Sequence, residues 1–403
     1  MNLTKKINTS IYKLSSWLDK YTMDGVYYGH DPFDTKECIN KLKKHTLLDI
    51  PRKVLIEIDE LINPKIIHKL FNIKPKINPK GQGLLMYSFA HLYELEQDPQ
   101  NLIKAKNIAK WLKNNSSKNY DDLCWGYPFD WHSKIFIPKD TPSTIVTTAI
   151  GDGLHKLHTI TKEQKYLDDC MSICNFLDTK LNISKEKNNT FCISYTPIDH
   201  FQVHNANLFT AEFLIRIGTL CNNQKWIDKG LKAAMFSVNE IKSDGSLYYW
   251  SKNQNKNAFN SQDIYHSGFE IRCLYNIWKT TQNKIFEKAY KNYLAFFTNK
   301  YFTNEKYLFK FTPNKTFPVD IHSCSEAIIT LTTVIKDHPE YLDLLNKSIN
   351  WTIDNMQSKK GWYIYRIVKK SYFTYKINFP YLRWGQSWML RALSSAYEIS
   401  KKN

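Results

Sequence analysis

The chain has 403 residues, of which 42% are hydrophobic and 23% are charged. This balance is typical of a globular protein and excludes an intrinsically disordered one. The net charge of +18 favours an anionic partner, such as an acidic sugar polymer, an anionic lipid surface or a nucleic acid. The lysines are scattered rather than clustered, so an AT-rich genome explains their excess equally well.

The motifs that the sequence lacks exclude several classes of enzyme and binding protein. Phosphate-binding loops, nucleophile elbows, zinc-protease signatures and dinucleotide fingerprints are all missing, and no nucleic-acid-binding module is visible. The eight cysteines include no CxxC pair and no cysteine–histidine group with zinc spacing. We therefore expect no cofactor, no bound metal, no nucleic-acid partner and reduced thiols.

The N-terminal segment, residues 1–75, begins with an amphipathic helix that carries Ile7, Ile11, Leu14 and Leu18 on one face. No stretch approaches the roughly 20 apolar residues that a membrane span requires, and no secretory signal is recognisable. We expect a cytoplasmic protein, and a peripheral contact with the inner membrane stays open. The segment is expected to pack on a single domain, residues 76–403.

That domain is built from an internal repeat of two helices, with a period of about 60 residues. The first helix of each pair carries small residues among aliphatic ones, as helices packed on both sides do. The second helix is amphipathic and follows a short polar turn. First helices are predicted at 83–95, 144–157, 206–218, 267–278, 324–335 and 385–400. Second helices are predicted at 97–112, 161–177, 222–238, 281–297 and 337–353.

Six inner helices with outer partners predict an all-α fold, an (α/α)6 toroid of helical hairpins. The chain opens with a helix and stops on an inner one, so the N-terminal helix is expected to supply the missing outer partner. An open solenoid of hairpins is the rival architecture. Short aromatic segments precede inner helices and predict β-hairpins on one rim of the ring. These segments are 191–197, 245–250, 307–313 and 361–368.

The loops before the inner helices are expected to meet over one mouth of the ring. Their aromatic rings are of the kind that stack on the apolar faces of sugars, and arginines pair with carboxylates or phosphates. The competing interpretation is that the rings only attach the loops to the ring of helices. The predicted substrate-binding residues from these loops are Trp125, Tyr127, Trp131, Tyr195, Tyr249, His266, Arg366, Arg383 and Trp384.

General acid and base candidates lie in the same loops. Asp130 stands between Phe129 and Trp131, where burial would raise the pKa of its carboxyl group. His266 and His322 occupy equivalent places in two repeats, which predicts one shared role, either catalytic or in hydrogen bonding between repeats. The remaining carboxylate candidates are Glu270, Asp320 and Glu326, for which a helix-capping or first-turn role is the alternative.

Several Trp-rich stretches resemble the VpsJ-like family of bacterial polysaccharide biosynthesis proteins. The chain is also distantly similar to the C-terminal domain of D-glucuronyl C5-epimerases. The resemblance runs from about residue 80 to the end. The matching stretches are 124–143, 192–199, 205–208, 244–249, 266–270, 317–331, 351–357, 361–366 and 380–390. Two of them add Asn205, in NANL, and Gln386, in PYLRWGQSWML, to the predicted binding residues.

The resemblance implies an (α/α)6 toroid with a place in capsule, exopolysaccharide or O-antigen synthesis. Epimerases of this kind use tyrosines and a carboxylate, and Tyr365, Tyr381 and Tyr249 lie in comparable loops. Unsaturated glucuronyl hydrolases of similar architecture use two aspartates, for which Asp130 and Asp320 are the nearest candidates.

Three functions therefore stay open. The first is a uronate C5-epimerase or a related proton-abstracting enzyme, in which Arg383 or Arg366 neutralises the uronate. A tyrosine or Asp130 takes the proton, and His322 or Glu326 orients the base. The second is a glycoside hydrolase of the six-hairpin class, and the third is a non-catalytic glycan-binding scaffold. The expected partner is an anionic polysaccharide or a lipid-linked or nucleotide-linked sugar.

Overall fold

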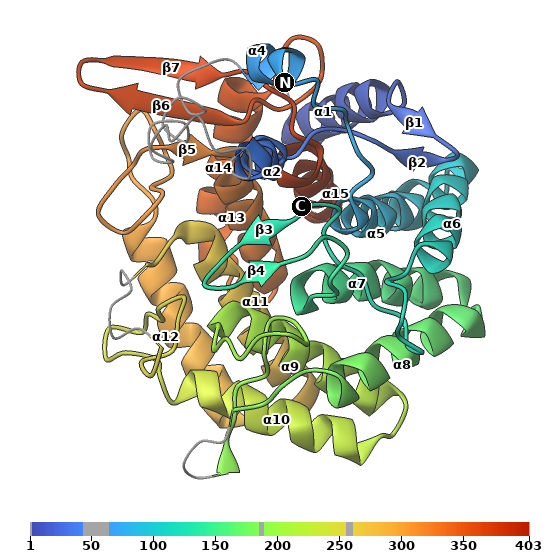
Figure 1. Ribbon diagram of the computed structural model, residues 1–403. Helices are drawn as coiled ribbons and strands as arrows, with labels where there is room; N and C mark the ends of the chain where they lie inside the picture. The colour runs from blue at the N-terminus through green and yellow to red at the C-terminus, as the bar shows by residue number, and fades with distance from the viewer. Residues whose placement is uncertain (1, 43–63, 185–188, 255–260, 403) are drawn as a thin grey trace.

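The computed structural model describes residues 2–42, 64–184, 189–254 and 261–402. Helices dominate these residues and form two concentric layers around a common axis (Figure 1). The inner helices are α5 (Pro79–Glu96), α7 (Thr144–Thr161), α9 (His204–Leu220), α11 (Ile264–Thr281), α13 (Ile321–Val334) and α15 (Trp388–Lys402). The outer helices are α1 (Leu3–Leu18), α6 (Pro99–Asn114), α8 (Gln164–Thr179), α10 (Gln224–Val238), α12 (Lys284–Lys300) and α14 (Leu342–Met356).

The ring is closed, as the repeat predicted, and the open solenoid is excluded. Each inner helix packs on the next, and α15 returns to pack on α5. Helix α1 packs against α15 and α14 and so takes the outer position of the last repeat. The hydroxyl of Thr4 donates to the carbonyl of Ser400 at 2.9 Å, and the hydroxyls of Ser10 and Tyr363 lie 2.6 Å apart. The first helix of the chain is therefore part of the ring.

The remaining described elements before α5 are β1 (Thr22–Met23), β2 (Val26–Tyr27), α2 (Pro32–Leu42) and α4 (Pro64–Leu70). Helix α2 contacts β3 (Trp131–His132), which pairs with β4 (Phe136–Ile137) in the long loop before α7. This part of the N-terminal segment thus lies over the same loops as the candidate site.

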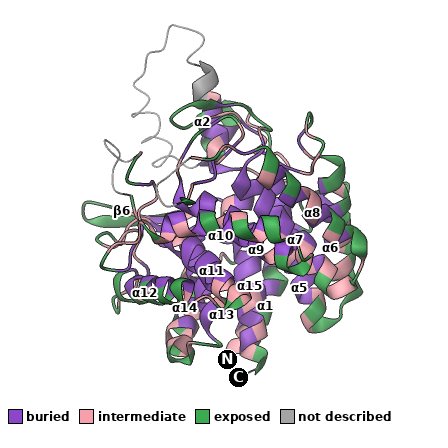
Figure 2. Cartoon of the chain, turned by 90° about the horizontal axis from the view of Figure 1, so that it is seen from below, coloured by how far each residue is buried: buried purple, intermediate pink, exposed green. Residues whose placement is uncertain are grey.

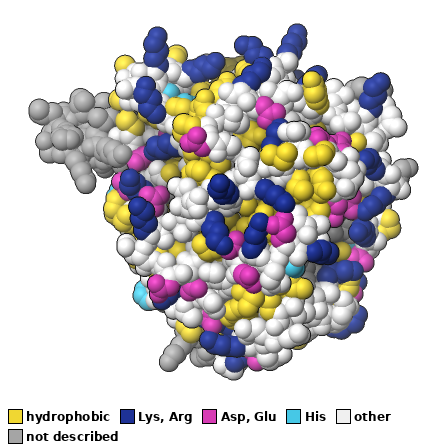
Figure 3. Space-filling model, turned by 90° about the vertical axis from the view of Figure 1, so that its right-hand side faces the viewer, with side chains coloured by type: hydrophobic (Ala, Val, Ile, Leu, Met, Phe, Trp, Pro, Cys, Tyr) yellow, Lys and Arg dark blue, Asp and Glu magenta, His cyan; other side chains and the backbone are white. Residues whose placement is uncertain are grey.

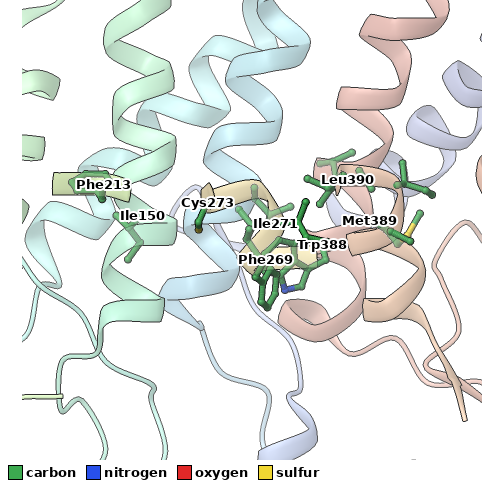
Figure 4. Packing of buried hydrophobic residues seen from close by; sticks show 14 of the residues in the cluster. Ile150, Phe213, Phe269, Ile271, Cys273, Trp388, Met389 and Leu390 are labelled. Atoms are coloured by element: carbon green, nitrogen blue, oxygen red, sulfur yellow. The ribbon is translucent and has the colours of Figure 1, made fainter. Parts of the chain in front are cut away.

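Burial separates the two layers of helices. Inner helices are buried on nearly all sides, whereas outer helices are buried on one face (Figure 2). Buried side chains from successive inner helices form one continuous apolar core, and Phe269 of α11 meets Trp388 of α15 within it (Figure 4). Their ring centroids are 5.3 Å apart. Removal of this apolar surface from water is the main term that stabilises the ring.

Short β-hairpins occur in the loops before inner helices, as predicted, but three of the four predicted segments do not form strands themselves. Segments 191–197, 245–250 and 307–313 form isolated bridges, for example between Val203 and Trp250, instead of strands. Their apolar residues pack on the ring, and their backbone meets a partner for only one or two residues. Only the last segment continues into a strand, in the sheet β5–β6–β7. These strands are β5 (Val319–Asp320), β6 (Arg366–Lys370) and β7 (Phe373–Ile377).

The basic side chains are spread over the surface. On the face in Figure 3, lysine and arginine side chains stand among acidic and uncharged ones instead of gathering in one patch. Within the described ranges, none of the helices combines the length and the apolarity that a bilayer crossing requires. The net charge therefore does not show by itself where a partner binds. The binding site is sought inside the ring instead.

Close helix packing gives a direct test of the ring. A Cβ at Gly83 of α5 would lie 2.9 Å from the Cα of Ile150 in α7, while one at Gly81 finds its nearest neighbour at 3.4 Å. We expect Gly83→Ala to lower the free energy of unfolding by about 1–3 kcal/mol through overpacking. Gly81→Ala, two residues away, should be neutral or stabilising because alanine favours the helix. Urea denaturation measures both, and equal destabilisation would contradict the close approach of α5 to α7.

Candidate functional site

The N-termini of the inner helices gather beneath the loops, and several are capped by side chains. Asn78 caps α5, Ser143 caps α7, Asp263 caps α11 and Asp320 caps α13, each by accepting a hydrogen bond from a backbone N–H of the first turn. These caps fix the positions of the residues that follow them. Residues on the first turns of α5, α11 and α13 therefore face one mouth of the ring.

A cavity of about 190 Å³ lies at this mouth. Its lining comes from the N-terminal segment, the loops and the first turns of inner helices, and most of it is aromatic. The predicted residues in the lining are Tyr127, Trp131, Tyr195, Asn205, Tyr249, His266, His322, Arg383 and Trp384. The lining residues that the sequence did not suggest are Phe33, Lys80, Phe129, Ile145, Tyr265 and Phe269.

His266 forms a dyad with the cap of its own helix. Its Nδ1 lies 2.6 Å from Oδ2 of Asp263, whose other oxygen accepts the backbone N–H of His266 at 2.9 Å. A carboxylate only accepts hydrogen bonds, so Nδ1 carries the proton and Nε2 is the basic nitrogen of the neutral ring. Asp263 therefore sets both the orientation and the tautomer of a general-base candidate.

His322 is buried within aromatic rings. It stacks on Tyr265 with centroids 4.7 Å apart and on Trp388 at 4.9 Å, and Trp384 meets it edge-on at 4.7 Å. Neither of its ring nitrogens has a hydrogen-bond partner among the described residues. Burial, together with the charges of Lys80 and Arg383, holds the pKa of His322 well below its usual value. The ring is therefore neutral, and its two nitrogens are buried beside the cavity without a partner among the described residues.

Two cations line the cavity, and they differ in their partners. Arg383 is held by Asp31 of the N-terminal segment, with Nε 2.5 Å from Oδ2 and Nη2 2.8 Å from Oδ1. Lys80, on the first turn of α5, lies over the rings of Trp388 and Phe269. Its backbone N–H donates to the Asn78 cap, but within the described ranges no hydrogen bond or ion pair is made by its Nζ. The guanidinium of Arg383 thus has a carboxylate partner, whereas the side-chain amine of Lys80 has none.

The predicted carboxylates lie outside the lining and have structural partners. Asp130 accepts the backbone N–H of Lys139 at 2.8 Å. Asp320 is fully buried, accepts the backbone N–H of His322 at 2.8 Å and pairs with Nε of Arg366 at 2.6 Å. The indole N–H of Trp384 also donates to Asp320, at 3.1 Å. Asp320 therefore places cavity residues as a cap and a hydrogen-bond hub.

The two glutamates four residues beyond the histidines are also buried. Glu326 forms a bidentate ion pair with Arg272, at 2.6 and 3.2 Å. Glu270 accepts the hydroxyl proton of Tyr293 at 2.7 Å, and burial raises the pKa of its carboxyl group well above the usual value. Both glutamates therefore join neighbouring helices, a structural role that differs from the capping or first-turn role given as their alternative.

Other predicted residues support the site from outside. The indole of Trp125 donates to the carbonyl of Leu112 in the core. Gln386 bonds to the backbone N–H and C=O of Tyr363, at 2.8 and 2.9 Å. Tyr365 and Tyr381 meet edge-on, 4.8 Å apart, in a small separate core cluster. The structure does not bring these side chains into the cavity.

The tyrosines of the cavity are neutral. Burial raises the pKa of Tyr195 and Tyr265 well above the usual value, and it also raises the pKa of Tyr249. No Asp or Glu belongs to the described lining, and no group of three or more metal-ligating side chains occurs within the described residues. The titratable groups that face the cavity are therefore two histidines, a lysine, an arginine and neutral phenols.

Two larger cavities have a different character. One of about 580 Å³ lies between α6 and the loop around Gly126, and Asn and Ser residues form much of its lining. The other, of about 360 Å³, is lined by residues further along the inner helices, among them Asp152, Arg216, Arg272 and Arg391. Asp152 pairs with Arg216 at 2.6 Å and with Arg391 at 3.4 Å. Apart from Trp125, neither cavity contains a residue predicted for the site.

Known structures share the fold. No protein-family profile and no curated protein matches the chain. An unsaturated glucuronyl hydrolase specific for heparin is 14% identical, with a TM-score of 0.64 over 99% of this chain and 98% of that one. Cellobiose 2-epimerase from Bacillus thermoamylovorans is 11% identical, with a TM-score of 0.67 over 98% and 99%. A family 76 glycoside hydrolase (mannosidase) from Bacteroides thetaiotaomicron is 11% identical, with a TM-score of 0.63 over all of both chains. These likenesses show the six-hairpin toroid fold.

The Asp31–Arg383 pair ties the N-terminal segment to the cavity. Both side chains are almost fully buried, so loss of one charge leaves the other unpaired in a medium that solvates it poorly. We expect Asp31→Asn to lower the free energy of unfolding by about 3–5 kcal/mol. Asp354→Asn, which breaks the exposed pair with Lys6, should cost less than about 1 kcal/mol. Urea denaturation compares the two, and a small effect of Asp31→Asn would contradict the buried pair.

Proposed function

We propose that this protein is a carbohydrate-active enzyme that moves a proton at a carbon atom of a sugar, as an epimerase or isomerase does. The observation that carries the proposal is the pair of histidines at the central cavity. His266, oriented by Asp263, and His322, neutral and unpartnered, come from equivalent places on adjacent inner helices. Tyr265 touches both, at centroid distances of 4.3 and 4.7 Å.

The two histidines suit complementary steps. Nε2 of His266 accepts a proton from the substrate carbon, and Asp263 stabilises the imidazolium that forms. His322 faces the same cavity as a second site for proton transfer or for a hydrogen bond to a substrate oxygen. An epimerase needs groups that remove and return a proton at different faces of one carbon atom. Two histidines from different helices supply such an arrangement.

The remaining lining supports a sugar as the ligand. Phe33, Phe129 and Tyr127 stack in sequence, with interplanar angles of 3° and 8°. Such flat rings pack against the C–H faces of a pyranose. The amide oxygen of Asn205 is buried without a hydrogen-bond partner in the described chain and would accept a sugar hydroxyl. The proteins of like fold include both a sugar epimerase and glycoside hydrolases, so the fold supports carbohydrate chemistry without choosing between them.

Glycoside hydrolysis is the second candidate and has less support from the cavity. It ordinarily needs two carboxyl groups about 5–5.5 Å apart for retention or about 6.5–9.5 Å apart for inversion. The nearby aspartates are instead bonded to His266, Arg383 and Arg366. A binding protein without catalysis is the third candidate, and the His266–Asp263 dyad favours an enzyme over it.

The biological setting is proposed from the sequence. The loops that resemble VpsJ-like proteins favour a substrate from a capsule, exopolysaccharide or O-antigen, either as a polymer or as a lipid-linked or nucleotide-linked precursor. The net positive charge is compatible with an acidic glycan.

Deuterium exchange tests the proposal. We incubate the protein with acidic and neutral sugars in deuterated water and follow each C–H signal by NMR. We expect exchange at one carbon, a loss of about 10²–10⁴-fold in its rate for His266→Gln, and a smaller loss for Asp263→Asn.

Asp130→Asn is the matched control because Asp130 lies outside the lining, and it should retain the exchange rate of the wild type. Cleavage without exchange would support the hydrolase instead. Binding with neither exchange nor cleavage would support the non-catalytic alternative.

A further inference from the structure

Lys80 occupies an unusual position at the base of the cavity. It follows the cap of α5, is only 4% exposed, and its Nζ lies 5.4 Å from the ring centroid of Trp388 and 5.9 Å from that of Phe269. Figure 4 shows those two rings side by side in the core. An ammonium group buried against aromatic faces keeps some cation–π attraction but loses most of its hydration.

The charged side chains around Lys80 form ion pairs with one another. Arg383 is held by Asp31, and Arg272 of α11 is held by Glu326 of α13. His322 of α13 is neutral. Burial first, and Arg383 next, lower the pKa of Lys80 well below its usual value, while Glu326 and Asp31 oppose this and Arg272 adds to it. Each acidic group near Lys80 is thus already bonded to an arginine.

We propose that Lys80 is the residue that recognises a carboxylate on the substrate, so that the site takes a uronic acid or a glycan that contains one. This inference rests on the proposed carbohydrate function and names its substrate class. One basic side chain without a counter-ion matches, once protonated, one singly charged carboxylate. A phosphate dianion would need a second free cation, and Arg383 is occupied by the bidentate contact with Asp31. Recognition is therefore assigned to Lys80, not to the arginines that the sequence suggested.

Binding of the carboxylate is coupled to uptake of a proton. Burial favours the neutral amine in the empty cavity, and a molecule whose Lys80 is neutral takes one proton from solvent on binding, so that the ammonium pairs with the carboxylate oxygens. The pKa of Lys80 is then higher in the complex than in the empty cavity. Between those two pKa values, the dissociation constant rises about tenfold for each unit of increasing pH, because the bound state holds one more proton.

The same contact assists the proposed chemistry. Removal of the proton beside a carboxylate places negative charge on the carboxylate oxygens. An ammonium in a dry, aromatic site stabilises that charge more than one in water does. Lys80 therefore both selects an acidic sugar and lowers the barrier to proton removal at the adjacent carbon.

Isothermal titration calorimetry with the whole protein tests the inference. The probes are D-glucuronate and D-galacturonate with their neutral counterparts D-glucose and D-galactose, in two buffers of different ionisation enthalpy. We expect each uronate to bind at least about tenfold more tightly than its neutral counterpart, because a hydrogen bond to a charged group contributes that much. We also expect uptake of a proton and weaker binding as the pH rises.

Lys80→Met is the decisive variant. Methionine keeps an unbranched stem of similar size, and removal of a buried amine that has no partner should leave the protein at least as stable as the wild type. The preference for uronates, the proton uptake and the pH dependence should all disappear. Lys134→Met is the matched control, because Lys134 is exposed in the loop between β3 and β4 and lies over the ring of Trp250. It should retain all three.

Equal binding of acidic and neutral sugars, binding of none of the four, or an undiminished preference in Lys80→Met would overturn the inference. Deuterium exchange is measured separately with neutral sugars. Exchange with a neutral sugar would then keep the proposed function while rejecting Lys80 as the carboxylate site. Absence of exchange with every sugar would reject the proposed function itself.

Discussion

Closure of the inner ring is the constraint on which the site depends. Helix α15 packs on α5, and α1 covers their outer side, so both ends of the chain take part in the last repeat. Close contacts between inner helices, such as that of Gly83 with Ile150, draw their N-termini around one axis. Loops from distant parts of the sequence then meet over the same mouth. Without closure, His266, His322, Lys80 and Arg383 would not share a cavity.

Burial decides which side chains inside the ring form ion pairs. Ionised groups there are expensive unless they are paired, and the arginines near the cavity are bonded to carboxylates. Arg272, which is paired with Glu326, lines the cavity further along the helices. Lys80 and His322 depart from this rule, since both face the aromatic cavity without partners. Buried basic side chains without protein partners are typical of ligand-binding sites.

The sequence predicts the ring well because its evidence is local and repeated. Small residues in one helix and charged residues in the next recur in each unit, and this contrast reflects burial directly. The rim strands were predicted less well, since an alternating pattern in 307–313 does not say whether a partner strand lies beside it. Only the segment that ends in β6 finds extended neighbours.

The site was predicted in part for the same reason. His266 and His322 were found through their recurrence, and the aromatic rings through their density in the loops. Lys80 and Phe33 escaped notice because their role arises from contacts with residues far away in the chain. Asp130, Tyr365 and Tyr381 carry suitable chemistry, but the loops turn them away from the cavity. Local sequence does not reveal that direction.

The central claim is that the aromatic cavity beneath the loops binds a sugar beside His266 and His322. A crystal structure of the protein soaked with acidic and neutral monosaccharides tests this most directly. The account predicts a sugar in the cavity of about 190 Å³, stacked on aromatic rings, with a C–H bond facing Nε2 of His266. A sugar bound only in the cavity around Asp152 and Arg391, or an empty central cavity at saturating concentration, would contradict it.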